Sequence, residues 1–311
     1  MNVNEFVTLV RGSFPELTPE QESMFRAMES LYNDWNSRIN VISRKDIDSL
    51  YIRHVLHSLA IAQYLKTMRP EIFETWRTPG TGINVLDLGT GGGFPGIPLA
   101  VLFPEVDFLL CDSVGKKTIV AKAVAEALGL QNVTVVNARA ESLPQKFDYV
   151  VSRAVTALDN FYPWVAGKYT GDIFYLKGGD FAEELCHMMQ IAGIQPGAVR
   201  TWKIQDWVDD PIFDEKYVID IPVGKKSLWR GNCMLKDFLS GMTARHCSAT
   251  YRSRSGRGSA CCSAAVTAWA RAHCSGRWRG CRNHLVELSD IPETEKRCWS
   301  RRASPRLPAL A

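Results

Sequence analysis

Short hydrophobic runs alternate with helical patterns along the middle of this 311-residue chain. The runs of strand length cover residues 83–88, 107–111, 133–137, 149–152 and 173–176. Apolar residues at helical spacing cover residues 97–103, 116–128 and 181–191. Strand-length apolar runs that alternate with helices are typical of a parallel sheet covered on both faces. We therefore predict an α/β fold with a mostly parallel twisted sheet, and an antiparallel edge pair at 199–204 and 217–223.

The first 80 residues carry helical patterns and no strand pattern. A helix start signal occurs at residues 18–21. Thr18 can cap the helix with its hydroxyl, Pro19 suits the first helical position, and the Gln21 side chain can bond back to the backbone N–H of the cap residue. Apolar residues at helical spacing then predict one helix over 18–38 and a second over 47–68. We expect an N-terminal helical extension over 1–80, followed by a core domain over 81–226.

The composition changes abruptly after residue 226. Residues 227–311 contain 15 Lys and Arg against 5 Asp and Glu, and they hold seven of the nine cysteines but only ten Leu, Ile or Val. This segment is interpreted as an out-of-frame translation of GC-rich DNA, as a basic RNA-binding extension, or as a metal module near Cys281 and His284. We favour the first and expect no folded domain, because neither an amphipathic period nor a CxxC pair is present.

Targeting signals are missing from the sequence. It contains no apolar run of 18 residues, and the N-terminal residues lack the basic, apolar and cleavage-site pattern of a signal peptide. A disulfide-rich segment would require an oxidising compartment, which nothing in the sequence supports. We expect a cytoplasmic, monomeric protein with no membrane partner.

A glycine-rich segment directly follows the first predicted strand. Five glycines occur within residues 89–96, and an apolar helical pattern comes next. A strand, a glycine loop and a helix bring backbone N–H groups up to a nucleotide-like ligand. Residues 91–96 match the dinucleotide pattern GxGxxG, whereas 89–93, preceded by Asp87, match the GxGxG pattern of S-adenosylmethionine sites. We favour S-adenosylmethionine, because a carboxylate at the strand end suits a ligand with an α-amino group.

Polar residues stand at the ends of several other predicted strands. Asp112 follows Asp87 by 25 residues, a spacing that lets it accept hydrogen bonds from ribose hydroxyls. The remaining strand ends carry Arg139-Ala140-Glu141, Ser152-Arg153 and Lys177-Gly178. Ligands bind beyond the carboxyl ends of strands in such sheets. We expect these residues to converge on one cleft, although each alone also fits a solvated loop.

Several motifs occur in a fixed order between residues 15 and 223. They are LYNDWN (31–36), RHVLHSL (53–59), DLGTGGGFPGIPL (87–99), DSVGKK (112–117), SRA (152–154) and LKG (176–178). Together they resemble the RsmG (GidB) family of bacterial methyltransferases, which methylate a guanine N7 of 16S rRNA. The resemblance implies a class I S-adenosylmethionine-dependent methyltransferase with a Rossmann-like core. One departure is His57, where the family usually has Asp in RHxxDSL; we expect it to be structural.

The resemblance also implies roles for individual residues. Ala140 and Glu141 are expected at the adenine, and Arg153 at the junction of cofactor and substrate. The full expected set of cofactor contacts is Asp87, Gly89, Gly91, Gly93, Phe94, Asp112, Ala140, Glu141 and Arg153. The residues expected to hold RNA phosphates are Arg53, Lys116, Lys117, Arg139 and Lys177.

Guanine N7 carries an in-plane lone pair and no proton, so its methylation needs no general base. We therefore expect Arg153 to act by positioning, with Phe94 beside it, and we expect no metal. Residues 1–226 carry a net charge of −6. Binding 16S rRNA or the small ribosomal subunit then requires basic residues that cluster locally, or a protein-bearing particle as substrate.

Three alternatives stay open at this point. A class I methyltransferase that acts on a protein or a small molecule would share the glycine loop and Asp112. A dinucleotide-dependent dehydrogenase would bind NAD in the same loop. An RNA-binding protein without enzymatic activity would act through the basic segment 227–311.

Overall fold

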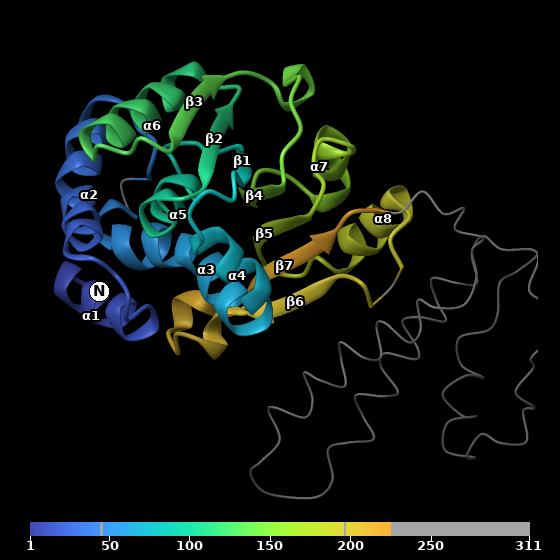
Figure 1. The fold of residues 1–311 in the computed structure, drawn as a ribbon, viewed down its shortest axis with the longest axis horizontal. Coiled ribbons are helices and arrows are strands. Elements are labelled where there is room, and N and C mark those ends of the chain that lie inside the picture. Colours follow the sequence, from blue (N-terminus) through green and yellow to red (C-terminus); the bar gives the residue numbers. More distant parts are fainter. Residues whose placement is uncertain (44–45, 196, 225–311) are drawn as a thin grey trace, which may run out of the picture. The chain divides into compact units, whose positions relative to one another are not determined.

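A single seven-stranded sheet forms the centre of the computed structural model, which describes residues 1–43, 46–195 and 197–224 (Figure 1). The strand order is β3-β2-β1-β4-β5-β7-β6. The strands are β1 (Asn84–Leu88), β2 (Asp107–Asp112), β3 (Val133–Asn137), β4 (Tyr149–Arg153), β5 (Asp172–Gly178), β6 (Arg200–Lys203) and β7 (Lys216–Pro222). Neighbouring strands among β1 to β5 pair in parallel, and β7 pairs antiparallel with both β5 and β6. The predicted α/β sheet and its late antiparallel pair are confirmed; within that pair β6 lies at the edge of the sheet and β7 lies between β5 and β6.

Eight α-helices accompany the sheet within the described residues. They are α1 (Val3–Ser13), α2 (Pro19–Arg38), α3 (His57–Met68), α4 (Pro70–Arg77), α5 (Gly96–Leu102), α6 (Gly115–Ala127), α7 (Leu158–Val165) and α8 (Ala182–Ala192). The predicted start of α2 is confirmed, because the Thr18 hydroxyl accepts from the Gln21 N–H and the Gln21 side chain accepts from the Thr18 N–H. The sequence analysis missed α1, α4 and α7. Within the described residues no helix is long and apolar enough to cross a bilayer.

The helix predicted over 47–68 is interrupted. A 3-10 turn at Ile47–Ser49 leads into a π-helical segment at Tyr51–Leu56, and α3 begins only at His57. A π turn holds more residues than an α turn and occurs frequently at functional sites. Hydrophobic spacing did not reveal it, because the apolar residues on either side still alternate at nearly helical intervals.

Alternating side chains divide the sheet between two helical layers. Val85 of β1 belongs to the core formed with α1 to α6, whereas Leu86 belongs to the core formed with α7 and α8. Figure 1 shows α5 and α6 on one side of the strands and α7 on the other. Trp76 of α4 is fully buried and packs edge-on against Phe108 and Phe174 of the sheet. The N-terminal extension therefore shares a core with the sheet.

A buried ion-pair network also fastens the extension to the sheet. Arg69, between α3 and α4, contacts Asp172 of β5 at 2.9 Å and Asp220 of β7 at 2.6 Å. The Tyr64 hydroxyl donates to the same Asp220 carboxylate at 2.7 Å. Asp220 is fully buried. Since breaking a buried pair leaves an uncompensated charge, this network holds the helical layer against the sheet strongly.

The chain divides into two units, Met1–Phe238 and Leu239–Ala311. All described residues belong to the first unit. The predicted unfolded or out-of-frame segment 227–311, with Cys281 and His284, lies outside the described residues.

Candidate functional site

The glycine loop after β1 requires backbone that only glycine adopts readily. Gly89, Gly91 and Gly93 have φ values of +74°, +57° and +108°. Asp87 holds the two ends of the loop together on the side facing the protein core. One of its carboxylate oxygens accepts a hydrogen bond from the Thr90 hydroxyl at 2.6 Å and another from the Gly96 N–H at 2.7 Å. The Asp87 side chain is fully buried, and burial raises its pKa to about 7.

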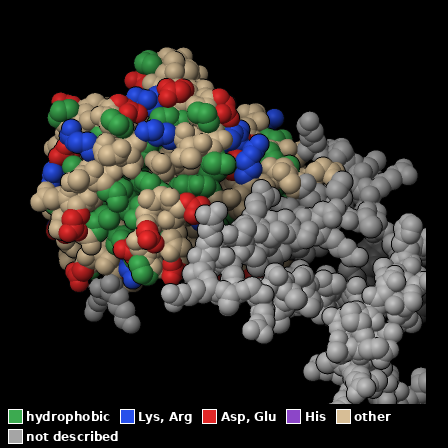
Figure 2. All heavy atoms as spheres, turned by 90° about the horizontal axis from the view of Figure 1, so that it is seen from below, with side chains coloured by type: hydrophobic (Ala, Val, Ile, Leu, Met, Phe, Trp, Pro, Cys, Tyr) green, Lys and Arg blue, Asp and Glu red, His purple; other side chains and the backbone are tan. Residues whose placement is uncertain are grey.

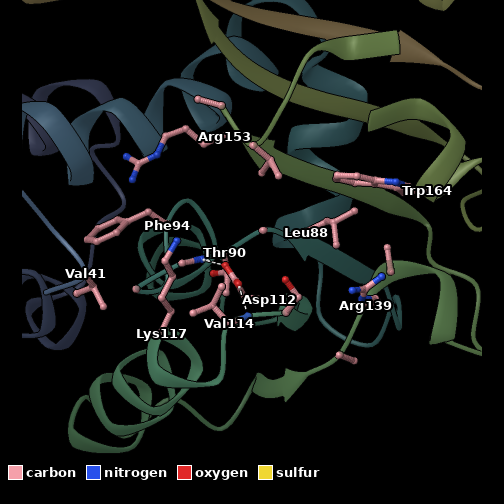
Figure 3. Close-up of a pocket in the computed structure, with 18 of the residues that line it drawn as sticks. Val41, Leu88, Thr90, Phe94, Asp112, Val114, Lys117, Arg139, Arg153 and Trp164 are labelled. Atoms are coloured by element: carbon pink, nitrogen blue, oxygen red, sulfur yellow. Dashed lines mark hydrogen bonds between the residues drawn. The ribbon is translucent and has the colours of Figure 1, made fainter. Parts of the chain in front are cut away.

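A cavity of about 520 Å³ lies over this loop. Its lining comes from the ends of β1, β2 and β4, from the segment after β3, and from helices α6 and α7. In Figure 3, Val41, Phe94 and Arg153 lie on one side of the cavity, and Arg139 and Trp164 lie on the other. The carboxyl ends of β1, β2 and β4 and the segment after β3 therefore converge on one site, as predicted. The prediction is wrong for Ser152 and for Lys177-Gly178 at the end of β5, which do not line the cavity.

Most of the predicted cofactor contacts line this cavity. They are Gly89, Gly91, Phe94, Asp112, Ala140, Glu141 and Arg153. Two predicted contacts, Asp87 and Gly93, do not line it. Asp87 lies beneath the loop, and a side chain at Gly93 would collide with Ile97, so this glycine serves the packing of the loop on α5.

Asp112 lies where β2 ends at the cavity. One carboxylate oxygen accepts from the Gly91 N–H at 2.9 Å, and the other accepts from the Val114 N–H at 2.8 Å. Each carboxylate oxygen has a further lone pair, so the group can also accept from ligand hydroxyls. Asp112 thus lies at the cavity beside the glycine loop, and its contact with ribose hydroxyls stays a prediction.

Arg153 ends β4 at the rim of the cavity. Its guanidinium lies over the Phe94 ring at 5.1 Å from the centroid, and Phe94 stacks on Tyr32. Among the described residues, the only hydrogen-bond partner of the Arg153 guanidinium is His54, with 3.0 Å between Nη2 and Nδ1. Burial lowers the pKa of Arg153 to about 10, so the group stays cationic at neutral pH.

The backbone that presents Arg153 is strained. The next residue, Ala154, has a φ of +47°, a region that non-glycine residues occupy rarely and mostly where function demands it. The Tyr175 hydroxyl accepts from the N–H groups of Val155 and Thr156 and so holds the segment that follows. The sheet therefore fixes the turn on which the Arg153 side chain stands.

Two of the five predicted phosphate-binding residues line the cavity, and the other three do not. Lys117 and Arg139 line the cavity, and in Figure 3 the Lys117 amine points toward Phe94. Lys116 is exposed but outside the lining. Arg53 pairs with Asp46 at 3.2 Å, and Lys177 pairs with Glu184 at 2.7 Å. On the face drawn in Figure 2, basic and acidic side chains are interspersed rather than gathered by sign.

The sequence analysis missed several lining residues. Val41 and Trp164 come from a loop and from α7, neither of which carries a local motif. Thr90 and Val114 lie inside segments that it did single out. His54 was noticed only as part of the RHVLHSL motif, and its contact with Arg153 across 99 residues of chain left no local signal.

His57 does not line the cavity. Its side chain is buried and meets Phe213 edge-on at 5.9 Å between ring centroids. Burial, followed by the nearby Arg153 charge, lowers its pKa well below 6.5, so the ring is neutral at physiological pH. This location agrees with the predicted structural role. No group of three His, Cys, Asp or Glu side chains that could hold a metal ion occurs within residues 1–43, 46–195 and 197–224.

The model of the GidB family, described as rRNA small subunit methyltransferase G, matches residues 21–193. This match spans more than half of the chain. The chain belongs to the GidB family. All residues that line the cavity, from Val41 to Trp164, fall within the GidB match.

Curated relatives agree with the GidB assignment. Ribosomal RNA small subunit methyltransferase G of Christiangramia forsetii is 42% identical over 226 residues, which cover 70% of this chain and 98% of the relative. The protein of the same name from Flavobacterium psychrophilum is 46% identical over 218 residues, covering 68% of this chain and 95% of the relative.

Among solved structures, magnesium protoporphyrin IX methyltransferase from Synechocystis with bound SAM is 14% identical. The similarity covers 67% of this chain and 99% of that one, with a TM-score of 0.46.

Proposed function

We propose that this GidB-family protein transfers a methyl group from S-adenosylmethionine to the N7 atom of a guanine in 16S rRNA. The observation that carries the proposal is one cavity in which a glycine loop and Asp112 stand next to the Arg153–Phe94 pair. The names of the curated relatives support ribosomal RNA of the small subunit as the substrate.

The residues of the cavity fit S-adenosylmethionine. A Cβ added at Gly91 would meet no atom within 4 Å, so this glycine leaves room for a ligand against the loop. Asp112 offers carboxylate lone pairs for ribose hydroxyls, and Ala140 and Glu141 line the cavity where the adenine is expected. The contact predicted between Asp87 and the methionine amine stays a prediction.

When bound, S-adenosylmethionine supplies an electrophilic methyl group that the N7 lone pair attacks directly. Because N7 bears no proton, the protein has to position the base and need not remove a proton. Orientation of two reactants alone is worth roughly 7–11 kcal/mol in well-aligned systems. Arg153 offers a guanidinium plane on which an unstacked base can be held, and the Phe94 ring supports that plane from behind. The further N–H donors of Arg153 are available to an acceptor such as guanine O6.

Lys117 and Arg139 are the basic residues best placed to hold RNA phosphates, because both line the cavity. Arg53 and Lys177 already carry ion-pair partners, so we assign them a smaller share of RNA binding. The sheet ends at Pro222 and the cavity is built from residues 41–164. We therefore expect residues 227–311 to be dispensable for methyl transfer.

The test uses the full chain, labelled S-adenosylmethionine, and small ribosomal subunits from cells that lack the modification. Nucleosides are then analysed by mass spectrometry. The proposal expects 7-methylguanosine from the wild-type chain and a far lower but measurable yield from Arg153→Ala, with both proteins folded by circular dichroism. Label in a ribosomal protein, or a methylated base other than 7-methylguanosine, would refute the proposed substrate. A parallel reaction on naked 16S rRNA distinguishes free RNA from the assembled particle.

A further inference from the structure

The π-helical segment places one histidine directly against Arg153. His54 lies inside this segment, Tyr51–Leu56, and its ring centroid is 5.2 Å from that of Phe94. Its Nδ1 atom lies 3.0 Å from Nη2 of Arg153. The Arg153 guanidinium in turn lies over the Phe94 ring, 5.1 Å from the ring centroid. His54, Arg153 and Phe94 thus contact one another pairwise at the rim of the cavity, although only the last two line it.

The position of the proton on His54 follows from this contact. An arginine side chain has donors but no acceptor, so Nδ1 of His54 must accept and the imidazole proton must be on Nε2. Burial and, after it, the Arg153 charge lower the pKa of His54 to about 3, so the ring is neutral at pH 7. The geometry and the electrostatics therefore agree on one tautomer.

The environment of Nε2, the other ring nitrogen of His54, indicates that this residue does more than fill space. Nε2 of His54 is buried and has no hydrogen-bond partner among the described residues. A buried donor without a partner is unfavourable, and each instance in a native structure calls for an explanation. An aromatic hydrocarbon side chain would fill the same space beside Phe94 without this cost. What it could not supply is the Nδ1 acceptor.

We propose that His54 is a positioning residue for Arg153, whose guanidinium it holds over the Phe94 ring through Nδ1. The pairing of β4 with β5 holds the backbone of Arg153 at one end, and His54 holds the guanidinium at the other. The remaining donors of Arg153 are then held ready for the ligands of the cavity. This proposal rests on the proposed function, because the role of Arg153 toward cofactor and guanine is part of it.

The kinetic test compares three replacements in the full chain. His54→Phe keeps a ring but removes the acceptor, and His54→Asn places an amide oxygen near the position of Nδ1. His54→Gln places its amide near Nε2 instead. We expect His54→Phe and His54→Gln to lower kcat roughly 10- to 100-fold with little change in KM for S-adenosylmethionine. His54→Asn should recover most of kcat, and His187→Asn, at an exposed histidine on α8, serves as the control.

Coupling to Arg153 separates positioning from packing. The double variant His54→Phe, Arg153→Ala should be no slower than Arg153→Ala alone, because the positioned group is already missing. If the two losses multiply, or if all His54 variants match the wild type, the proposal is wrong. Should His54→Phe fail to fold, the comparison of His54→Asn with His54→Gln decides alone, and equal rates contradict the proposal.

A readout independent of activity distinguishes this proposal from the proposed function. With ¹⁵N-labelled histidine, NMR at pH 7 should show His54 with a bare Nδ1 and a protonated Nε2, its signals assigned by their loss in His54→Asn. The opposite tautomer overturns the positioning role even if the enzyme is active. The expected tautomer in a wild-type chain that makes no 7-methylguanosine would instead refute only the proposed function.

Discussion

Gly91→Ala tests the cofactor loop with the smallest possible side chain. Gly91 has a φ of +57° and lines the cavity, and a Cβ there has no atom within 4 Å. Alanine in left-handed backbone costs about 1–2 kcal/mol of stability. The methyl group would also occupy space that a ligand needs, and an added methyl in a packed site costs about 1–3 kcal/mol. At 1.4 kcal/mol per tenfold change, this corresponds to a roughly 5- to 150-fold weaker Kd for S-adenosylmethionine.

The matched control for this variant is Gly82→Ala. Gly82 also has a positive φ, +64°, with no atom within 4 Å of an added Cβ, but it lies before β1 and away from the cavity. Both variants should lose similar free energy of unfolding, whereas only Gly91→Ala should weaken binding in titration calorimetry. Gly89 is unsuitable, because a Cβ there would collide with the Val155 side chain. If Gly91→Ala binds S-adenosylmethionine as tightly as Gly82→Ala, the assignment of the loop is wrong.

Three further predictions concern stability, pH and RNA. Asp220→Asn should lower the free energy of unfolding by about 3 kcal/mol in urea titrations. Arg200 is half-exposed and lies 3.3 Å from Asp220, so Arg200→Ala should lower it by under about 1 kcal/mol. Equal losses in the two variants would contradict a stabilising role of the buried network. The pKa of Asp87 is raised to about 7 in the folded chain, so between about pH 4 and pH 7 this carboxyl is protonated in the folded chain and ionised in the unfolded chain. The unfolded chain then binds fewer protons than the folded chain, and the stability that this group contributes falls as pH rises toward 7. Asp87→Asn should flatten that slope, and an unchanged slope would exclude Asp87 as its source. Arg139→Ala should reduce the salt dependence of RNA binding by about one phosphate contact; an identical slope would remove Arg139 from the interface.

The hydrophobic pattern predicted the sheet well, because the central parallel strands β1, β4 and β5 are buried along most of their length and are flanked by turn residues. Val133–Asn137 forms β3 as expected, and the start of α2 at Thr18 followed from capping chemistry. Helix α7 escaped prediction because Pro163 lies inside it, and proline within a pattern normally indicates the end of a helix. The π-helical segment escaped because one extra residue in a turn barely alters the apolar spacing.

The candidate site was predictable where its residues belong to one short segment of the sequence. The glycine loop and Asp112 are consecutive with strand ends, so the sequence placed them correctly at the cavity. Asp87 lies beneath the loop and does not line the cavity, because a motif fixes the position of a residue but not the direction of its side chain. Its contact with the methionine amine stays a prediction. Trp164 and His54 depend on contacts between distant segments, which a single sequence does not record.

The position of β7 inside the sheet has a consequence for how the chain folds as it is synthesised. β6 hydrogen-bonds to β7 and not to β5, so it cannot join the sheet until a strand that follows it in the chain has left the ribosome. Until then the edge of β5 stays open, and Arg69 has only Asp172 of its two sheet partners. Open strand edges pair readily with other chains. The nascent protein is therefore most prone to aggregate in the interval before β7 emerges, and its insertion both closes the edge and completes the buried ion pair.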